Sequence, residues 1–356
     1  NQLNLGVQLI ENKKEREYLA NLNLKAGEKA KVTVLKPLDI VTTASAVGDV
    51  LGALQTLPGT SAAAEDGRLF VRGGNAEETQ IFIDGVRVFT PYSPSPNNAP
   101  TRGRYSPFLF KGITFSTGGY SAEYGQALSG VLDLTTIDKP DQEKTEISLM
   151  SVGGGLGNTQ KWEKSSLSVN ASYINLAPYI AAYPDRNDWE KPFEAFAGET
   201  VFRRKFENGL FKLYAAFDTT NFELTQDDIN IPEGVNFGLK NNNFYTNASY
   251  RGDIADTWKL VTGGSYTYTK NTVDVLNNDI GSRENSFHFK AKLRKRFSNR
   301  VKLNFGVDQF LTDFTENFQN PEFQADYGFN NNISAAFAET DVVFSKKFAL
   351  KAGVRG

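Results

Sequence analysis

The residues that could do chemistry are few and widely separated in this 356-residue chain. It has one histidine, His288, and no cysteine, which excludes most zinc, haem and Cys–His sites. Asp84, Asp133 and Asp138 are candidate acids, but each is isolated, with no Ser–His pair or paired-acid spacing nearby. Asp84 precedes a glycine, which is typical of a turn residue. The sequence therefore predicts a protein that is not an enzyme and has no cofactor, no metal and no catalytic residues.

The amino-acid composition limits the binding partners and the cellular compartment that can be expected for this protein. The formal net charge is −2, so no broad basic field is present and no nucleic-acid partner is expected. No segment approaches the roughly 18–20 consecutive apolar residues of a spanning helix. The chain opens on a polar segment without a signal peptide, which fits a cytosolic protein or a trimmed mature chain. The mean hydropathy of −0.40 does not exclude a membrane, because transmembrane barrels alternate apolar and polar residues.

Two short apolar runs between residues 68 and 85 organise the first third of the chain. Leu69–Val71 runs into Arg72-Gly73-Gly74, and Ile81–Ile83 runs into Asp84-Gly85. Glycine reaches backbone angles that other residues adopt only with strain. The pattern predicts a strand, a turn and a second strand.

A helix is expected just before these strands. Val50, Leu51, Leu54 and Leu57 follow helical spacing, Asp49 can cap the first turn, and Pro58-Gly59 ends the helix. The β-prone run at 40–43 predicts a short strand ahead of it. Residues 1–37 are polar, and their pattern fits either a short helix around 9–24 or a solvated, partly disordered lead-in.

The segment 91–108 is predicted to be a loop, because four prolines interrupt it. It is either a plain surface connection or a contact surface for a ligand. In the second case the candidate ligand-binding residues are those that offer stacking and charge, namely Tyr92, Arg102, Arg104 and Tyr105.

After Pro140 the pattern changes to the two-residue period of β-strands. The alternation is cleanest at 285–297, where Phe287, Phe289 and Leu293 share one face. The opposite face carries Ser286, His288, Lys290, Lys292, Arg294 and Arg296. A lysine or arginine facing lipid at mid-bilayer costs about 2–4 kcal/mol. We therefore expect these cations to point inward or to lie beyond the membrane edge.

Turn positions add to the case for a membrane barrel. Tight turns are expected at 207–209, 253–256, 298–300 and near 346–347, and long polar loops at 175–192, 224–241, 273–284 and 315–331. Short turns at one end and long loops at the other are typical of outer-membrane barrels. The alternative is a soluble β-sandwich or propeller with long hairpins. About ten strands are expected, at 143–155, 162–174, 193–207, 209–223, 242–254, 257–271, 284–298, 300–314, 332–346 and from 348 onward.

Four short motifs then give the chain a family resemblance. They are Leu54–Gly59, Val71–Gly74, Ile83–Gly85, and Ala122–Gly125 with Ser129-Gly130-Val131. In this order and spacing the chain resembles a TonB-dependent outer-membrane receptor of the kind common in Bacteroidetes. The resemblance implies a mainly β protein: an α+β plug domain in the lumen of an antiparallel transmembrane β-barrel.

The same resemblance implies a domain division. Residues 1–37 would be a periplasmic lead-in, 38–140 the plug, and 141–356 part of a barrel that has 22 strands in the family. Strands run to the last residue, so we expect the chain to be part of a longer receptor. The TonB box is expected upstream of Asn1 or within the lead-in.

Two residues are candidates for a plug–barrel lock. Family plugs often carry two arginines that pair with barrel glutamates, and Arg72 matches the first. Thr117 occupies the place of the second, so the lock is expected to be built differently here. Glu123, in the Ala122–Gly125 motif, is the other lock candidate.

The resemblance implies TonB-driven import of a scarce, bulky solute across the Gram-negative outer membrane: siderophore-bound iron, an oligosaccharide or a peptide. Haem is less expected, since one histidine gives no ligand pair. The implied partners are TonB with ExbB and ExbD, outer-membrane lipid and lipopolysaccharide, and a possible surface lipoprotein lid. The alternative is a receptor-like structural subunit of a larger outer-membrane assembly, with transport secondary or absent.

Overall fold

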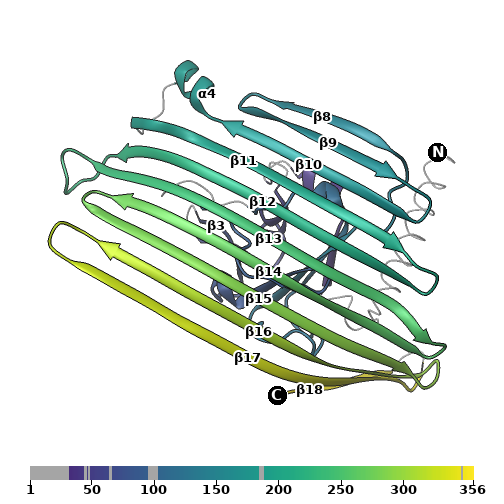
Figure 1. The fold of residues 1–356 in the computed structure, drawn as a ribbon. Helices are drawn as coiled ribbons and strands as arrows, with labels where there is room; N and C mark the ends of the chain where they lie inside the picture. Colours follow the sequence, from purple (N-terminus) through teal and green to yellow (C-terminus); the bar gives the residue numbers. More distant parts are fainter. Residues whose placement is uncertain are drawn as a thin grey trace.

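The computed structural model describes residues 32–43, 46, 49–63, 66–94, 103–183, 188–345 and 348–356. It has two parts: a small mixed sheet with short helices, and a large antiparallel sheet (Figure 1). The small part lies against one face of the large sheet, and we call it the plug and the large sheet the wall. The expected helix around 9–24 and the candidate Arg102 fall outside the described residues.

The plug is built around a five-stranded sheet of order β1-β6-β7-β4-β5, in which β4 and β7 are parallel and the other pairs antiparallel. A separate pair, β2 with β3, lies beside it. The plug elements are β1 Val32–Leu35, α2 Pro37–Thr42, α3 Val50–Leu54, β2 Thr60–Ala63, β3 Asp66–Val71, η2 Ala76–Glu78, β4 Thr79–Ile83, β5 Val86–Val88, η3 Pro107–Leu109, β6 Phe110–Ser116 and β7 Gly130–Thr136.

The two predicted apolar runs are strands, but they lie in different sheets. Leu69–Val71 is the end of β3, which pairs with β2. Ile81–Ile83 is the end of β4, whose five residues are all buried between β5 and β7. Burial of β4 on both faces makes it the centre of the plug core, which also includes Leu54, Phe110 and Leu132.

The helix predicted before these strands is confirmed as α3. Asp49 is its N-cap, and the Asp49 carboxylate accepts a hydrogen bond from Gly52 N at 3.1 Å. The same carboxylate accepts a hydrogen bond from Gly103 N at 3.2 Å, which ties the helix to the loop after β5.

The strand predicted at 40–43 is wrong, because residues 37–42 form helix α2. Pro37 stands in its first turn, where a missing N–H leaves no donor unsatisfied. The Asp39 carboxylate accepts a hydrogen bond from Lys36 N at 2.8 Å. These start signals outweigh the β-propensity of Ile40 and Val41. The first strand of the plug is instead β1, which pairs with the edge of β6.

The wall is an antiparallel sheet of eleven strands in sequence order. Its elements are β8 Lys144–Met150, β9 Gly153–Lys161, β10 Ser165–Asn175, α4 Ala177–Ala182, β11 Asp188–Lys205, β12 Gly209–Gln226, β13 Val235–Ala255, β14 Trp258–Val275, β15 Asn278–Arg296, β16 Val301–Gln319, β17 Gln324–Val343 and β18 Ala349–Arg355. The mainly β fold predicted from the sequence is confirmed.

One strand more than expected is present because the segment 143–155 is a hairpin, with β8 and β9 meeting at Ser151-Val152. The glycines after the turn hid it, since they weaken the alternation. They are required by close approach: a Cβ on Gly153 would lie 2.0 Å from Tyr173 O on β10.

The predicted long loops are also largely wrong. The strands continue through most of those ranges, and β14 joins β15 through residues 276–277 alone. Leu276 has a φ of +55°, and its backbone helps make this tight turn. We call this end of the wall, which includes α4, the hairpin end. The other end, with connections 162–164, 206–208, 256–257, 297–300 and 344–348, is the turn end (Figure 1).

The two faces of the wall differ as the alternation predicts. On β15, Ser286, His288 and Lys290 are buried toward the plug, whereas Phe287 and Phe289 are exposed on the far side. Large apolar side chains occupy outward positions on neighbouring strands, among them Leu213, Phe217, Phe244, Tyr266 and Leu311. The wall therefore presents an apolar outer face and a mostly polar inner face, on which Val201, Tyr214 and Tyr245 pack against the plug core. None of the helices in the described part of the chain is both long and apolar enough to cross a membrane.

The Asp49 cap gives a first testable prediction. Asp49→Ala should destabilise α3 by about 1 kcal/mol, because Gly52 N loses its acceptor. Amide hydrogen exchange of 50–54 in the intact receptor should accelerate by about fivefold. Asp49→Asn is the matched control, since asparagine caps equally well. Equal acceleration in both variants would contradict a capping role.

Candidate functional site: the plug–wall interface

The ionisable side chains that the sequence scatters come together where the plug meets the inner face of the wall. They form three groups. The linker cluster is Asp84, Lys111, Asp138, Lys212 and Arg251; the Glu123 cluster is Glu123, Lys290, Lys292, Asp308 and Arg355; and the loop cluster is Thr90, Arg104, Asp218, Asn241 and Asn243.

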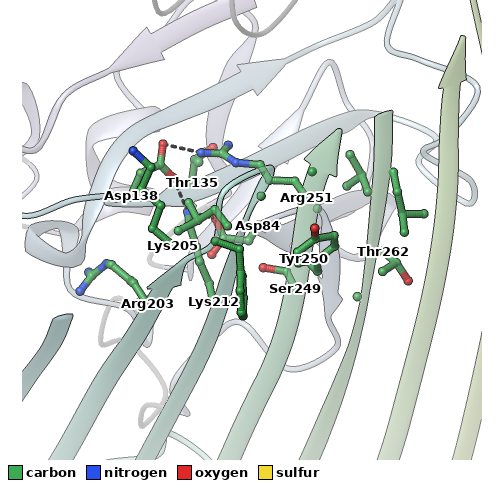
Figure 2. Close-up of a pocket in the computed structure, with 18 of the residues that line it drawn as sticks. Asp84, Thr135, Asp138, Arg203, Lys205, Lys212, Ser249, Tyr250, Arg251 and Thr262 are labelled. Atoms are coloured by element: carbon green, nitrogen blue, oxygen red, sulfur yellow. Dashed lines mark hydrogen bonds and ion pairs between the residues drawn. The ribbon is translucent and has the colours of Figure 1, made fainter. Parts of the chain in front are cut away.

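Lys212 is the centre of the linker cluster. It lies on the inward face of β12, with its side chain only 3% exposed. Its Nζ lies 2.9 Å from Asp84 Oδ1 and 2.8 Å from Asp138 Oδ1, and it donates a hydrogen bond to Thr136 O at 2.7 Å (Figure 2). Lys212 of the wall is therefore bonded to the end of β7, to the turn after β4 and to the segment that leaves the plug.

Asp138 gathers two further cations. Its Oδ2 lies 2.5 Å from Lys111 Nζ and 2.5 Å from Arg251 Nη2. Burial by itself would raise the pKa of the Asp138 carboxyl, but the positive charges of Lys212, Arg251 and Lys111 outweigh it, and the net shift is downward. The carboxylate therefore stays ionised and joins plug, linker and wall.

The prediction that Asp84, Asp133 and Asp138 are isolated is wrong. Asp84 and Asp138 share Lys212, and the charge of Asp84 acts on Asp133. Burial, reinforced by the charges of Asp84 and Glu123, raises the pKa of Asp133 to about 7. The three are brought together by the parallel pairing of β4 with β7, which places the end of one strand beside the end of the other.

Asp84 is also a turn residue, as its position before Gly85 predicts. Its φ is +51° and that of Gly85 is +85°. The Asp84 carboxylate accepts hydrogen bonds from Thr136 N at 3.1 Å and from Thr136 Oγ1 at 2.5 Å. These bonds fix the left-handed turn against β7 and aim the carboxylate at Lys212.

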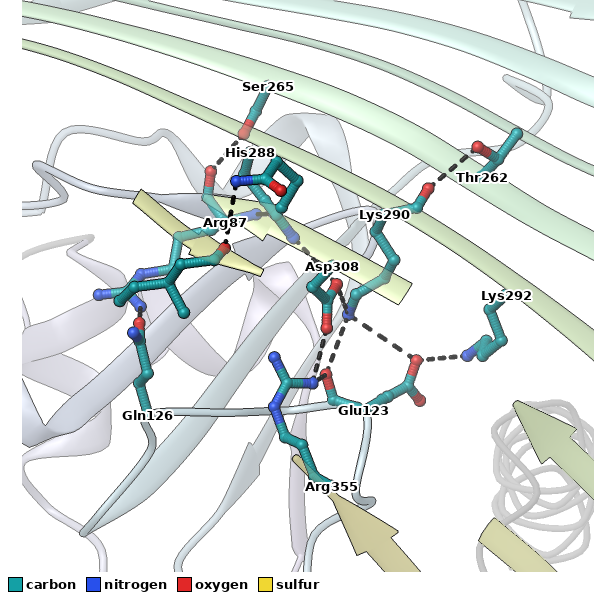
Figure 3. Close-up of polar contacts among 12 residues, drawn as sticks. Arg87, Glu123, Gln126, Thr262, Ser265, His288, Lys290, Lys292, Asp308 and Arg355 are labelled. Carbon is teal, nitrogen blue, oxygen red and sulfur yellow. Dashed lines mark hydrogen bonds and ion pairs between the residues drawn. The ribbon is translucent and has the colours of Figure 1, made fainter. Parts of the chain in front are cut away.

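The Glu123 cluster joins the long turn between β6 and β7 to strands β15, β16 and β18 (Figure 3). Glu123 Oε2 pairs closely with Lys292 Nζ and lies 3.9 Å from Lys290 Nζ. Arg355 Nη1 lies 2.6 Å from Asp308 Oδ2 and donates to Glu123 O at 3.3 Å. A Cβ on Gly125 would lie 2.2 Å from Arg355 Nε, so this glycine allows the arginine to approach the turn.

The pKa of Glu123 reflects this setting. Burial alone would raise it, but the charges of Lys292 and Lys290 and the hydrogen bond from Lys292 lower it from 4.5 to about 2. The glutamate is therefore ionised at neutral pH. The sequence predicts that Lys290, Lys292 and Arg294 point inward or lie beyond the membrane edge, and the first alternative holds, because all three line the space beside the plug.

His288, which the alternation puts on the polar face of 285–297, joins the plug to the wall. Its Nδ1 accepts a hydrogen bond from Arg87 N at 2.9 Å, so Nε2 carries the proton and donates to Asp308 Oδ1 at 3.1 Å. The ring stacks on Phe310 with a centroid separation of 4.2 Å. No group of acids and histidines in the described residues could hold a metal ion.

Arg104, predicted to bind a ligand, lies in the loop cluster with its side chain 3% exposed. It pairs closely with Asp218 on β12 and donates to Asn241 Oδ1 at 3.1 Å and to Thr90 O at 3.0 Å. Asn243 adds hydrogen bonds to Thr90 and Asp218. The guanidinium is thus bonded to both the plug loop and the wall.

Tyr105 and Tyr92 are placed in the same region. Tyr105 is buried between Tyr214 and Tyr245 of the wall, with ring centroids 6.1 and 5.9 Å away. The Tyr92 hydroxyl accepts a hydrogen bond from Leu69 N at 3.4 Å inside the plug. The structure therefore gives three of the four candidates a partner within the protein, and ligand binding by the four stays a prediction.

Arg72 lies apart from these clusters. Its φ is +51°, its N donates to Gly59 O at 2.9 Å, and its side chain is exposed with no ion pair to any described residue. Its role as a lock residue stays a prediction. Lys212 and Asp218, which sequence reasoning did not single out, could have been found by extending the two-residue alternation along β12.

Both the plug and the wall are similar to parts of known proteins. Residues 26–131 match the family model described as the TonB-dependent receptor plug domain. The whole fold is similar to solved structures of the outer-membrane transporter YddB from Escherichia coli (TM-score 0.67, 11% identity) and the alcaligin receptor FauA from Bordetella pertussis (TM-score 0.66, 11% identity). It is also similar to the ferric yersiniabactin uptake receptor FyuA from Yersinia pestis (TM-score 0.56, 12% identity).

These alignments cover 91%, 91% and 88% of this chain but only 56%, 54% and 62% of the matched chains, in the same order. The chain thus spans a little over half the length of the structures it resembles. Its eleven-stranded wall corresponds to part of a closed barrel. None of the matches bears on an origin in Bacteroidetes, which stays a prediction.

Lys212 gives the second prediction. Lys212→Met leaves Asp84 and Asp138 without their shared cation in a buried setting, which should destabilise plug docking by about 3–5 kcal/mol. In the intact receptor, hydrogen exchange of β4 and β7 should accelerate strongly. The control is Lys191→Met, which removes an exposed lysine from β11. If β4 and β7 stay as protected as in the unmodified receptor, Lys212 is not an anchor.

Glu123 gives a third prediction, on pH. Its lowered pKa means that its stabilisation of the docked plug is fully present above about pH 4.5 and is lost as the pH falls toward 2. Plug docking should therefore weaken over this range, and Glu123→Gln should remove that part of the pH dependence. Acid titration of the intact receptor, followed by protease access to the plug, measures it. An unchanged titration in Glu123→Gln would refute this assignment.

Proposed function

We propose that this chain, which comprises the plug and part of the barrel of a TonB-dependent receptor of the outer membrane, serves in the energy-driven import of a bulky solute. The observation that carries the proposal is a folded plug held against the inner face of the wall by ion pairs and hydrogen bonds. An apolar contact of Tyr105 with Tyr214 and Tyr245 adds to these bonds. Water can replace the polar contacts one by one when the plug moves, because hydrogen bonds to water compensate for those that are lost.

The source of energy follows from the location. The outer membrane has no ATP supply or ion gradient of its own, so plug displacement must be driven from the periplasm. We infer that the turn end faces the periplasm, because its connections have five residues or fewer, whereas the hairpin end also carries the eight-residue connection 227–234, and the shorter turns of outer-membrane barrels are periplasmic. TonB, with ExbB and ExbD, is the proposed partner, pulling on the segment before β1. Contacts with lipopolysaccharide and a surface lipoprotein lid stay predictions.

The solute is proposed by class only. Similar structures include a ferric yersiniabactin receptor, an alcaligin receptor and the copper transporter OprC, so a metal or its chelate is one candidate solute. An oligosaccharide or peptide stays open, because the identities of 11–14% carry fold and not specificity. The hairpin end, where strands extend beyond the plug, is the proposed capture surface.

Deletion tests the pulling model. In the full-length receptor, with any export signal kept, removal of the other residues before Val32 leaves β1 and its pairing with β6 in place. Uptake should be lost while solute binding at the cell surface is retained. Undiminished uptake would contradict pulling and would favour the structural-subunit alternative.

A disulfide tether tests plug displacement. This chain has no cysteine of its own that could compete with the introduced pair. Thr90 Oγ1 of the plug and Thr269 Oγ1 of β14 lie 2.9 Å apart, so Thr90→Cys with Thr269→Cys should cross-link. Oxidation should block uptake and a reductant should restore it. Thr269→Cys alone is the control. Full uptake by the oxidised double variant would show that this plug segment does not move.

A further inference from the structure

A cavity of about 890 Å³ lies between the plug and the wall, toward the turn end. On the plug side it is lined by the turn after β4, by Asp133 and by Asp138. On the wall side it is lined by residues of β11 to β15, among them Arg203, Lys212 and Thr262 (Figure 2). The turns at 162–164 and 206–208 also line it. Its volume is within the range of small-molecule sites.

The residues that line the cavity carry a net positive charge, although the whole chain carries a net negative charge. Twelve lysine and arginine residues line the cavity against seven carboxylates, whereas the whole chain carries a formal charge of −2. The pKa of one of these carboxyls, Asp133, is raised by burial to about 7, so its negative charge is incomplete near neutral pH. A cleft of one sign between low-dielectric walls concentrates ions of the opposite sign.

The ion pairs do not neutralise this excess, because single carboxylates serve several cations. Asp138 contacts Lys111, Lys212 and Arg251. Glu123 contacts Lys290 and Lys292. Lys164 and Lys205, at the mouth, form no ion pair with any described carboxylate. Positive charge therefore remains available to a ligand.

A buried donor marks the wall side of the cavity. The Arg203 side chain lies on the inward face of β11 and is 2% exposed. Its Nε donates to Ile137 O, and its Nη1 donates to Ser168 Oγ at 2.9 Å and to Val201 O at 3.2 Å. Its Nη2 is buried and has no hydrogen-bond partner among the described residues. Buried donors normally have partners, and a guanidinium suits carboxylate and phosphate oxygens.

We propose that this cavity is a binding site for a small, multiply charged anion, with carboxylate or phosphate groups held by Arg203, Lys164 and Lys205. Its position inside the barrel lumen excludes a lipid headgroup embedded in the bilayer. The site is distinct from the hairpin-end capture surface. Any part in transport, such as retaining an acidic solute on the periplasmic side of the plug, depends on the proposed function; the binding itself does not.

The test is calorimetric titration of the purified full-length receptor with citrate and with pyrophosphate at constant ionic strength. Saturable binding of either is expected, and the tighter of the two identifies carboxylate or phosphate as the preferred group. Trp162 lines the cavity and gives a fluorescence readout of the same event. Trehalose is the neutral comparison, and equal binding of trehalose would overturn recognition by charge.

Variants locate the site. Lys164→Gln with Lys205→Gln should weaken anion binding by about tenfold, since each removes an exposed charge contact. Lys240→Gln with Lys270→Gln, an equal charge change at exposed outer positions of β13 and β14, should leave it unaltered. Arg203→Gln should weaken binding further; if that variant fails to fold, the lysine pair decides. Absence of saturable binding, or unaltered binding in the lysine pair, would overturn the proposal. Because neither TonB nor uptake enters the titration, failure here leaves the import function untouched.

Discussion

The contact of Lys212 with Asp84 and Asp138 is the interaction on which the arrangement of plug and wall depends. It joins the turn after β4, the end of β7 and the linker into the wall at one nitrogen atom. A buried lysine is stable only with such partners, because desolvation of an unpaired charge is costly. The pairing therefore fixes where the plug sits as well as how firmly it is held.

The same constraint shapes the rest of the inner face. Glu123 with Lys292, Arg104 with Asp218, and the hydrogen bonds of His288 repeat the pattern of one plug group and one wall group. A wall with apolar residues outside has its alternate positions left for the plug, and most of these are polar, although Val201, Tyr214 and Tyr245 pack into the plug core. Polar contacts to the plug and a lipid-facing outer surface are thus two consequences of one two-residue period.

Much of the fold could be predicted from local pattern. The alternation at 285–297 correctly put Lys290 and Lys292 on the face opposite Phe287 and Phe289, and Asp49 correctly marked the start of α3. The predictions of secondary structure failed where local sequence signals conflict or are weak. Ile40 and Val41 favour a strand, but Pro37 and Asp39 start a helix. The glycines after Ser151 concealed a hairpin, and strands continued through ranges whose polar composition suggested loops.

The sequence by itself determined the class of the protein: a two-residue period with one apolar face, preceded by a plug marked by glycine-bounded motifs. These properties are local, because side-chain direction along a strand and the backbone freedom of glycine depend on a few neighbouring residues. Only the tertiary structure decided which charges meet. Asp84 and Lys212 are 128 positions apart, and Arg104 and Asp218 are 114 apart. Their contact depends on strand register, on the parallel pairing of β4 with β7, and on the position of the plug against the wall. A local sequence pattern encodes none of these.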